Sequence, residues 1–215
     1  MMLNTAEIHK EFGAPGDWGN FVRIQFPYAM RIAWDLDKTI QKTWCHKDIK
    51  QPLLDVLNEL LDHYGFEKIQ ELGIDLYGGL LNVRKKRGGR TWSTHSWGIA
   101  IDLDPLRNGL RTRAPKAQFS KPEYKPLIDI FYKHGFINYG VERGFDWMHF
   151  EFAMSAIEVK KKRFDELLTK CIEGFTSSDS DSVFIHEGAD DFNRGAKVAL
   201  IEVQNQYREL FKIKK

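Results

Sequence analysis

Two histidines and two aspartates are spaced in a way that suits a metal-dependent hydrolase. His95 and Asp102 lie seven residues apart in the segment STHSWGIAID, and Asp146 precedes His149 in the segment DWMHFE. Two imidazoles and one carboxylate are the three-ligand set of a catalytic zinc, which leaves a fourth position for water. Hydrolysis also needs a base beside that water, and Asp146 is a spare carboxylate three residues before His149. The pattern predicts metal ligation by His95, Asp102 and His149.

Strand alternation predicts that these side chains share a polar face. Apolar residues occupy the alternate positions of both segments: Ile99, Ile101 and Leu103 in the first, Met148, Phe150 and Phe152 in the second. Because successive side chains of a strand point to opposite faces, Asp102 and His149 should point away from the apolar side. Glu151 shares the parity of His149 and is a candidate for orienting it. Gly98 permits a tight bend that returns His95 toward Asp102.

A structural hydrogen-bond network is the alternative interpretation. A buried histidine is more often a hydrogen-bonded core residue than a metal ligand, and Asp–His pairs are common in ordinary networks. This alternative must explain two histidines, a facing aspartate and a spare acid at once, so the metal site is favoured.

Composition and periodicity indicate a mixed fold. The chain has 215 residues, of which 42% are hydrophobic and 29% charged, which is typical of one globular domain with or without an appendage. We expect a loop over residues 11–31, a helix from Pro52 to Gly65, an extended segment over 74–83 and a helix ending at Gly135. Helices mixed with a few short strands predict an α+β fold.

The C-terminal quarter is predicted to be a helical extension. We place a catalytic domain at residues 1–153 and the extension at 154–215, with a linker at 176–182, where the sequence reads TSSDSDS. A helix should run from Ser155 through Cys171, and a last amphipathic helix should begin near Asn193.

Charge and hydropathy limit the partners. The formal net charge of +2 gives no general argument for nucleic acid, although Arg84 to Arg90 form a basic cluster. The N-terminus lacks the basic start and apolar core of a secretion signal, and no apolar run is long enough for a membrane span. We therefore expect a chain made in the cytoplasm that neither binds nucleic acid nor inserts into a membrane. The oligomeric state is left open.

Together, the two motifs resemble those of the zinc peptidase family that contains D-alanyl-D-alanine carboxypeptidases and L-alanyl-D-glutamate endopeptidases, in particular the branch that includes phage endolysins. The family pattern is Ser-x-His, then Gly-x-Ala-x-Asp, and later an acid near a histidine; STHSWGIAID and DWMHFE fill every position. The resemblance covers roughly residues 11–153. It implies a hedgehog/DD-peptidase-like fold, in which helices flank a small antiparallel sheet.

The resemblance implies roles for seven residues. It implies that zinc is held by His95, Asp102 and His149, and that Asp146 is the catalytic acid/base where many members have Glu.

The remaining implied roles concern the substrate. Arg84 corresponds to the arginine that stabilises the oxyanion, and Arg87 is the alternative for that role. Ser93 corresponds to a substrate-binding serine, and we assign Arg87 to binding a substrate carboxylate through its bidentate fork. The implied reaction is hydrolysis of peptidoglycan stem peptides, with the L-Ala–D-Glu bond favoured, by an endolysin-like enzyme that acts on the cell wall after release. Two alternatives stay open: a D-Ala-D-Ala carboxypeptidase or dipeptidase, and a non-catalytic, zinc-retaining wall-binding module. The latter should lack the base or the arginine, and both are present here.

Overall fold

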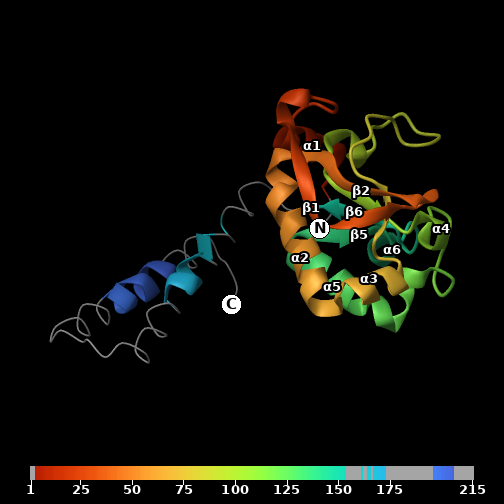
Figure 1. Ribbon diagram of the computed structural model, residues 1–215. Helices are drawn as coiled ribbons and strands as arrows, with labels where there is room; N and C mark the ends of the chain where they lie inside the picture. Colours follow the sequence, from red (N-terminus) through yellow and green to blue (C-terminus); the bar gives the residue numbers. More distant parts are fainter. Residues whose placement is uncertain (1–2, 154–160, 162–163, 166, 173–195, 206–215) are drawn as a thin grey trace. The chain divides into compact units, whose positions relative to one another are not determined.

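The computed structural model describes residues 3–153, 161, 164–165, 167–172 and 196–205. By its internal contacts the chain divides into two compact units, Met1–Met154 and Ser155–Lys215. The first unit combines one six-stranded sheet with helices (Figure 1), so the α+β prediction is confirmed. In the described part of the chain, no helix has the length and apolar character needed to cross a membrane.

The secondary structure of the first unit follows the chain in order. The strands are β1 Phe21–Ile32, β2 Asp35–His46, β3 Leu76–Gly79, β4 Ala100–Leu103, β5 Phe136–Asn138 and β6 His149–Phe152. The α-helices are α1 Thr5–Phe12, α2 Lys50–Tyr64, α3 Phe66–Leu72, α4 Pro105–Asn108, α5 Lys125–Lys133 and α6 Tyr139–Arg143. Short 3-10 helices lie at η1 Trp18–Asn20, η2 Lys47–Ile49, η3 Thr94–Trp97, η4 Gln118–Ser120 and η5 Pro122–Tyr124.

The sheet is larger than the small antiparallel sheet that we expected. Its strand order is β2-β1-β3-β4-β6-β5, with β1 and β3 parallel and the other neighbours antiparallel. Strand β4 thus lies between β3 and β6. The short strands β3, β4 and β6 bring the two sequence motifs side by side.

The prediction of a loop over residues 11–31 is wrong from Phe21 onward, where β1 begins; between the end of α1 and η1, residues 13–17 form no helix or strand. Its inward side chains recur at every second residue, from Ile24 through Phe26 and Tyr28 to Met30, and all four are buried. This period is the strand signal that the Gly, Pro and aromatic content obscured. Pro27 lies where the β1–β2 register shifts between Gln25 and Met30, so the proline occurs at an irregularity of the ladder.

Helices α2 and α5 pack against the sheet. Helix α2 ends at Tyr64 and is capped by Gly65, the residue that we expected to stop it. It contacts both β1 and α5, and Figure 1 shows α2 and α5 side by side. The ring of Phe131 on α5 stacks on Phe150 of β6, with centroids 4.0 Å apart. Because Phe150 is anchored in the core on this face, its neighbours His149 and Glu151 must emerge on the other face.

The second unit is described only in part. Residues 167–172 and 196–205 are helical, and the side-chain amide of Gln204 donates to the hydroxyl of Thr169 at 2.6 Å. The expected linker at 176–182 lies outside the described residues, as do the expected helix starts at Ser155 and Asn193.

Candidate metal centre

Asp102 and His149 face each other across the pairing of β4 with β6. They are partners in the antiparallel register, and Asp102 also pairs with Gly79 on the other side of its strand. A Cβ on Gly78 would lie 3.0 Å from the Cβ of Asp102, so the Gly78-Gly79 pair lets β3 approach closely. Strand β4 is therefore packed closely between β3 and β6, and this pairing places Asp102 beside His149.

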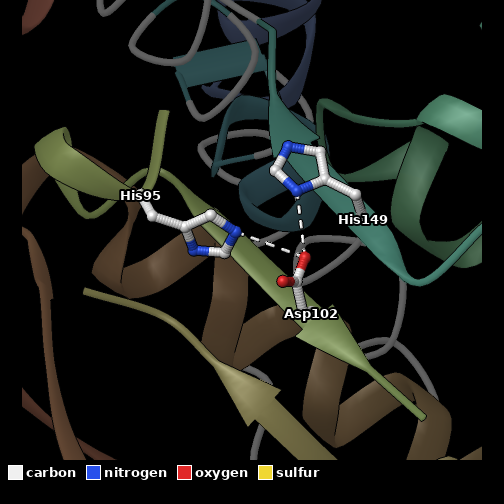
Figure 2. A group of neighbouring side chains, drawn as sticks. All are labelled: His95, Asp102 and His149. Carbon is white, nitrogen blue, oxygen red and sulfur yellow. Dashed lines mark hydrogen bonds and ion pairs between the residues drawn. The ribbon is translucent and has the colours of Figure 1, made fainter. Parts of the chain in front are cut away.

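The three predicted ligands converge on one oxygen. Figure 2 shows His95 and His149 pointing at the Oδ1 atom of Asp102, with His95 Nε2 at 3.2 Å and His149 Nδ1 at 2.9 Å. One ligand atom of each residue lies within 4.8 Å of the other two, and all three side chains are buried. Two nitrogens and one carboxylate oxygen at this separation are a donor set that suits a zinc ion.

The backbone orients His95. Its Nδ1 lies 2.6 Å from the carbonyl oxygen of Leu80, so Nδ1 carries the proton and donates it, which leaves Nε2 as the ligand atom. That Nε2 is buried and makes no hydrogen bond; its 3.2 Å contact with Asp102 Oδ1 is one between two potential ligand atoms. Gly98, which ends η3, has a φ of 64°, and a Cβ there would meet the backbone nitrogen of His46 at 3.0 Å. The tight bend predicted at Gly98 is therefore present.

A second carboxylate orients His149. The Nε2 of His149 lies 3.4 Å from Glu151 Oε2 and 3.3 Å from the hydroxyl oxygen of Thr94. The same Glu151 oxygen accepts a hydrogen bond of 2.6 Å from Tyr139, at the start of α6. A carboxylate behind the outer nitrogen of an imidazole fixes the tautomer and makes the other nitrogen a better ligand.

The electrostatics of the centre favour a positive charge. Burial alone would raise the pKa of Asp102, but His95 and His149 outweigh it and hold that pKa well below its usual range. Burial alone would lower the pKa of His149, but the carboxylates of Asp102 and Glu151 raise it to about 10. The two carboxylates thus stabilise a positive charge at His149. The same negative charge would stabilise a metal ion held by Asp102 and the two histidines.

Asp146 lies in a tight turn just before β6. Its φ is 62°, and its carbonyl oxygen accepts the backbone N–H of His149 at 3.1 Å. The side chain is 8% exposed, and its Oδ1 is buried without a hydrogen-bond partner. Burial raises the pKa of the Asp146 carboxyl, with the nearby Asp102 adding to the effect. A carboxylate with a raised pKa and an unused oxygen is suited to accept a proton.

All seven site residues predicted from the sequence line one cavity of about 570 Å³. Arg84 is held at its edge: the N–H of Ser93 and the hydroxyl of Ser96 both donate to its carbonyl oxygen, at 3.1 and 2.8 Å. Its guanidinium donates to the carbonyl oxygen of Lys85 at 3.3 Å. Arg87 is exposed, whereas Ser93 is buried. The cavity is therefore lined by the three candidate metal ligands, by Asp146 and by the cationic side chains.

Several cavity residues have no marked signal in the sequence. Trp34, at the turn between β1 and β2, lines the cavity although it is 69% exposed. Three other tryptophans near the two motifs, Trp92, Trp97 and Trp147, are not among the lining residues. Trp97 is instead a core residue that donates to the carbonyl oxygen of Gly13. Tyr139 and Arg143 of α6 also line the cavity, and only the packing of α6 against β6 brings them there.

Comparison with known families agrees with the site. Residues 87–152 match the model of a peptidase family described as D-alanyl-D-alanine carboxypeptidase. The matched segment contains His95, Asp102, Asp146 and His149 but ends at β6, and Arg84 lies just before it. Comparisons with curated proteins and with solved structures gave no match.

Proposed function

We propose that this protein is a zinc-dependent peptidase that hydrolyses peptidoglycan stem peptides. The observation that carries the proposal is the convergence of His95, Asp102 and His149 in a cavity that Asp146 also lines. The match to a peptidase family over residues 87–152 supports it. A closed structural metal site would have four protein ligands and no cavity of this size beside it.

Asp146 is the proposed proton carrier. A zinc ion held by His95, Asp102 and His149 would supply a Lewis acid for the attacking water and the scissile carbonyl. Asp146 Oδ1 accepts the proton of the attacking water and passes it to the amine that leaves when the C–N bond breaks. Its burial keeps the carboxylate in a dry environment, where its raised pKa makes it the stronger base.

Three further side chains that line the cavity stabilise the reacting oxygen and bind the substrate. Arg84 stabilises the negative charge that develops on the carbonyl oxygen, because a guanidinium donates to an oxyanion more strongly than to a neutral carbonyl. Ser93 and Arg87 bind the carboxylate of the substrate next to the scissile bond, the arginine through its bidentate fork.

The proposed scissile bond is L-Ala–D-Glu, as in an endolysin-type enzyme that is made in the host cytoplasm and acts on the wall after release. A D-Ala-D-Ala carboxypeptidase is the second candidate, and the description of the matched family favours it. Both substrates have a carboxylate beside the scissile bond: the α-carboxylate of D-Glu in one, the C-terminal carboxylate in the other. The same residues therefore serve either bond.

Cleavage of isolated peptidoglycan tests the proposal. Purified protein is incubated with sacculi with and without a chelator, and the new termini are identified by mass spectrometry. New D-Glu amino termini support the endopeptidase, and released D-Ala supports the carboxypeptidase. Restoration of cleavage by added zinc after chelation assigns the metal.

Two further outcomes contradict the proposal. Metal-independent cleavage would remove the role of the centre in catalysis. Binding of zinc and of sacculi without any cleavage, on several wall types, would instead support a non-catalytic wall-binding module.

A further inference from the structure

The apolar side chains of the cavity and most of its cationic ones come from opposite ends of strand β4. The cationic side chains that line it are Arg84, Lys86, Arg87 and Arg143. The first three belong to the segment that follows β3. That segment runs beside the loop that leads into β4, since the N–H of Ser93 donates to the carbonyl oxygen of Arg84. These three cations therefore lie at the end where β4 begins, whereas Arg143 ends α6 and lies over the ring of Tyr139.

The apolar side chains belong to the end where β4 stops. Tyr77 of β3 pairs with Leu103, the last residue of β4, and the carbonyl oxygen of Tyr77 accepts the N–H of Ala33, next to Trp34. The carbonyl oxygen of Met148 accepts the N–H of Leu103 at 2.9 Å. The other apolar lining residues follow β4 or precede β6 in the chain: Pro105, Leu110 and Phe145. The cavity is therefore cationic at one end of β4 and mainly apolar at the other.

Trp34 is the most exposed apolar side chain of this lining, at 69%. Ile32 pairs with Asp35, so Ala33 and Trp34 form a two-residue turn between β1 and β2. Ala33 is buried, and its N–H is bonded to the carbonyl oxygen of Tyr77 at 3.0 Å. A tight turn anchored in this way fixes the backbone of Trp34, while the indole ring stays accessible to a ligand in the cavity.

The two ends of the cavity orient the substrate. In the proposed function, Ser93 and Arg87 bind the carboxylate of D-Glu, on the C-terminal side of the scissile bond. The N-terminal side of the substrate then extends toward the apolar end. In peptidoglycan this side is L-Ala, whose nitrogen is acylated by the lactyl group of a muramic acid ring. The sugar is thus one residue away from the L-Ala–D-Glu bond, whereas three further residues separate it from the D-Ala–D-Ala bond.

An indole ring suits a sugar because both are amphipathic. The face of an aromatic ring carries partial negative charge and attracts the C–H groups on one face of a sugar, while the indole N–H and the sugar hydroxyls stay in contact with water. We propose that Trp34 binds the sugar ring to which the stem peptide is attached, so that the protein cleaves the L-Ala–D-Glu bond of glycan-linked peptides in preference to free peptides. This inference rests on the proposed function in its endopeptidase form.

Two compounds that differ in the sugar ring test this assignment. The first is N-acetylmuramoyl-L-Ala-γ-D-Glu-L-Lys, and the second is D-lactoyl-L-Ala-γ-D-Glu-L-Lys, which keeps the linker but lacks the sugar. We expect the protein to prefer the muramoyl compound by about fivefold in kcat/KM, the size of one aromatic contact. Trp34→Ala should reduce this ratio to near one. Trp34→Phe should leave an intermediate ratio, because the smaller ring keeps a flat face.

Trp18→Ala is the matched control. Trp18 is 61% exposed, which is similar to Trp34, but it is not among the residues that line the cavity. Its substitution should leave the ratio unchanged. The ratio also separates sugar binding from a disturbed turn, because a general loss of active protein would slow the cleavage of both compounds by the same factor.

Binding separates this inference from the proposed function. Calorimetry with Asp146→Asn measures the affinity for both compounds with little turnover, and Trp34→Ala is added to the same variant. If the unsubstituted protein cleaves neither compound nor sacculi, but the muramoyl compound binds more tightly and Trp34→Ala removes the difference, the proposed function fails and the sugar site stands.

The opposite outcomes overturn the assignment of Trp34. Release of D-Ala from sacculi, together with equal affinities for the two compounds, would leave a peptidase without a sugar site. A preference for the muramoyl compound that Trp34→Ala leaves intact would place the sugar elsewhere.

Discussion

Glu151 lies behind His149 on the same face of β6, with Oε2 at 3.4 Å from the outer imidazole nitrogen Nε2. Tyr139 donates to that oxygen at 2.6 Å, so the carboxylate is itself held in place. The arrangement turns the inner nitrogen, Nδ1, toward Asp102. A buried chain of three residues therefore sets the orientation of one ligand of the candidate metal centre.

Removing the charge of Glu151 should weaken metal binding. Glu151→Gln keeps the shape of the side chain but loses the negative charge that supports His149, so the affinity for zinc should fall by about 10- to 100-fold. Competition with a chromophoric chelator measures this. Glu67→Gln, at an exposed position of α3, is the control that should change nothing. An unchanged affinity in Glu151→Gln would show that Glu151 does not support the ligand.

Metal binding and turnover should be lost separately. His149→Ala removes a ligand and should abolish stoichiometric zinc, which elemental analysis of the dialysed protein detects. Asp146→Asn removes the proton acceptor but no ligand, so it should keep the zinc and lose turnover by about 100-fold or more. Full activity in Asp146→Asn would reject Asp146 as the base.

Gly140 is expected to tolerate no side chain. A Cβ at this position would lie 2.0 Å from the Trp147 ring, which adjoins Asp146 in the chain. Gly140→Ala must therefore displace the ring and should destabilise the fold by about 1–3 kcal/mol, measured by urea unfolding. At Gly89 an added Cβ would meet only ordinary contacts, so Gly89→Ala should change the stability little. Equal stability of the two variants would contradict the packing described for α6.

A surface cluster away from the cavity should make stability depend on pH. Burial alone would raise the pKa of the Glu59 carboxyl, but hydrogen bonds from Lys133 and His134, at 2.8 and 2.7 Å, outweigh it and lower that pKa. A carboxyl whose pKa is lower in the folded state stabilises above its unfolded pKa of about 4.3, and this contribution is lost as the pH falls through the folded value.

Glu59→Gln should therefore cost about 0.5 kcal/mol near pH 7, since the group is partly exposed, and almost nothing at pH 3. Urea unfolding of both proteins at the two pH values measures the difference. A destabilisation that is the same at both would indicate lost packing rather than lost charge.

The sequence was most informative where the strand period and the ligand spacing agree. In β6 the alternation placed Phe150 and Phe152 on one face and His149 and Glu151 on the other, and the structure confirms both faces. Gly98 was likewise recognised as a bend, because few other residues adopt a positive φ without strain.

The sequence was least informative for the first 46 residues. Pro27 and the aromatic content of β1 led to the expectation of a loop, and β2 is a polar edge strand whose exposed side chains show little alternation. Trp34 reaches the cavity only because β1 pairs with β3, a contact between segments more than 40 residues apart. Long-range pairing of this kind leaves no local pattern.

The amino-acid sequence by itself determined the chemistry of the candidate site: two imidazoles, a carboxylate and a spare acid. Strand parity and the bend at Gly98 also predicted where His95, Asp102 and His149 point. Only the tertiary structure decided how these groups meet. The pairing of β4 with β6 brings His149 Nδ1 to 2.9 Å from Asp102, and the packing of α6 adds Tyr139 and Arg143 to the cavity. Side-chain type and strand parity are local properties, whereas the distance between two strands depends on the packing of the whole sheet.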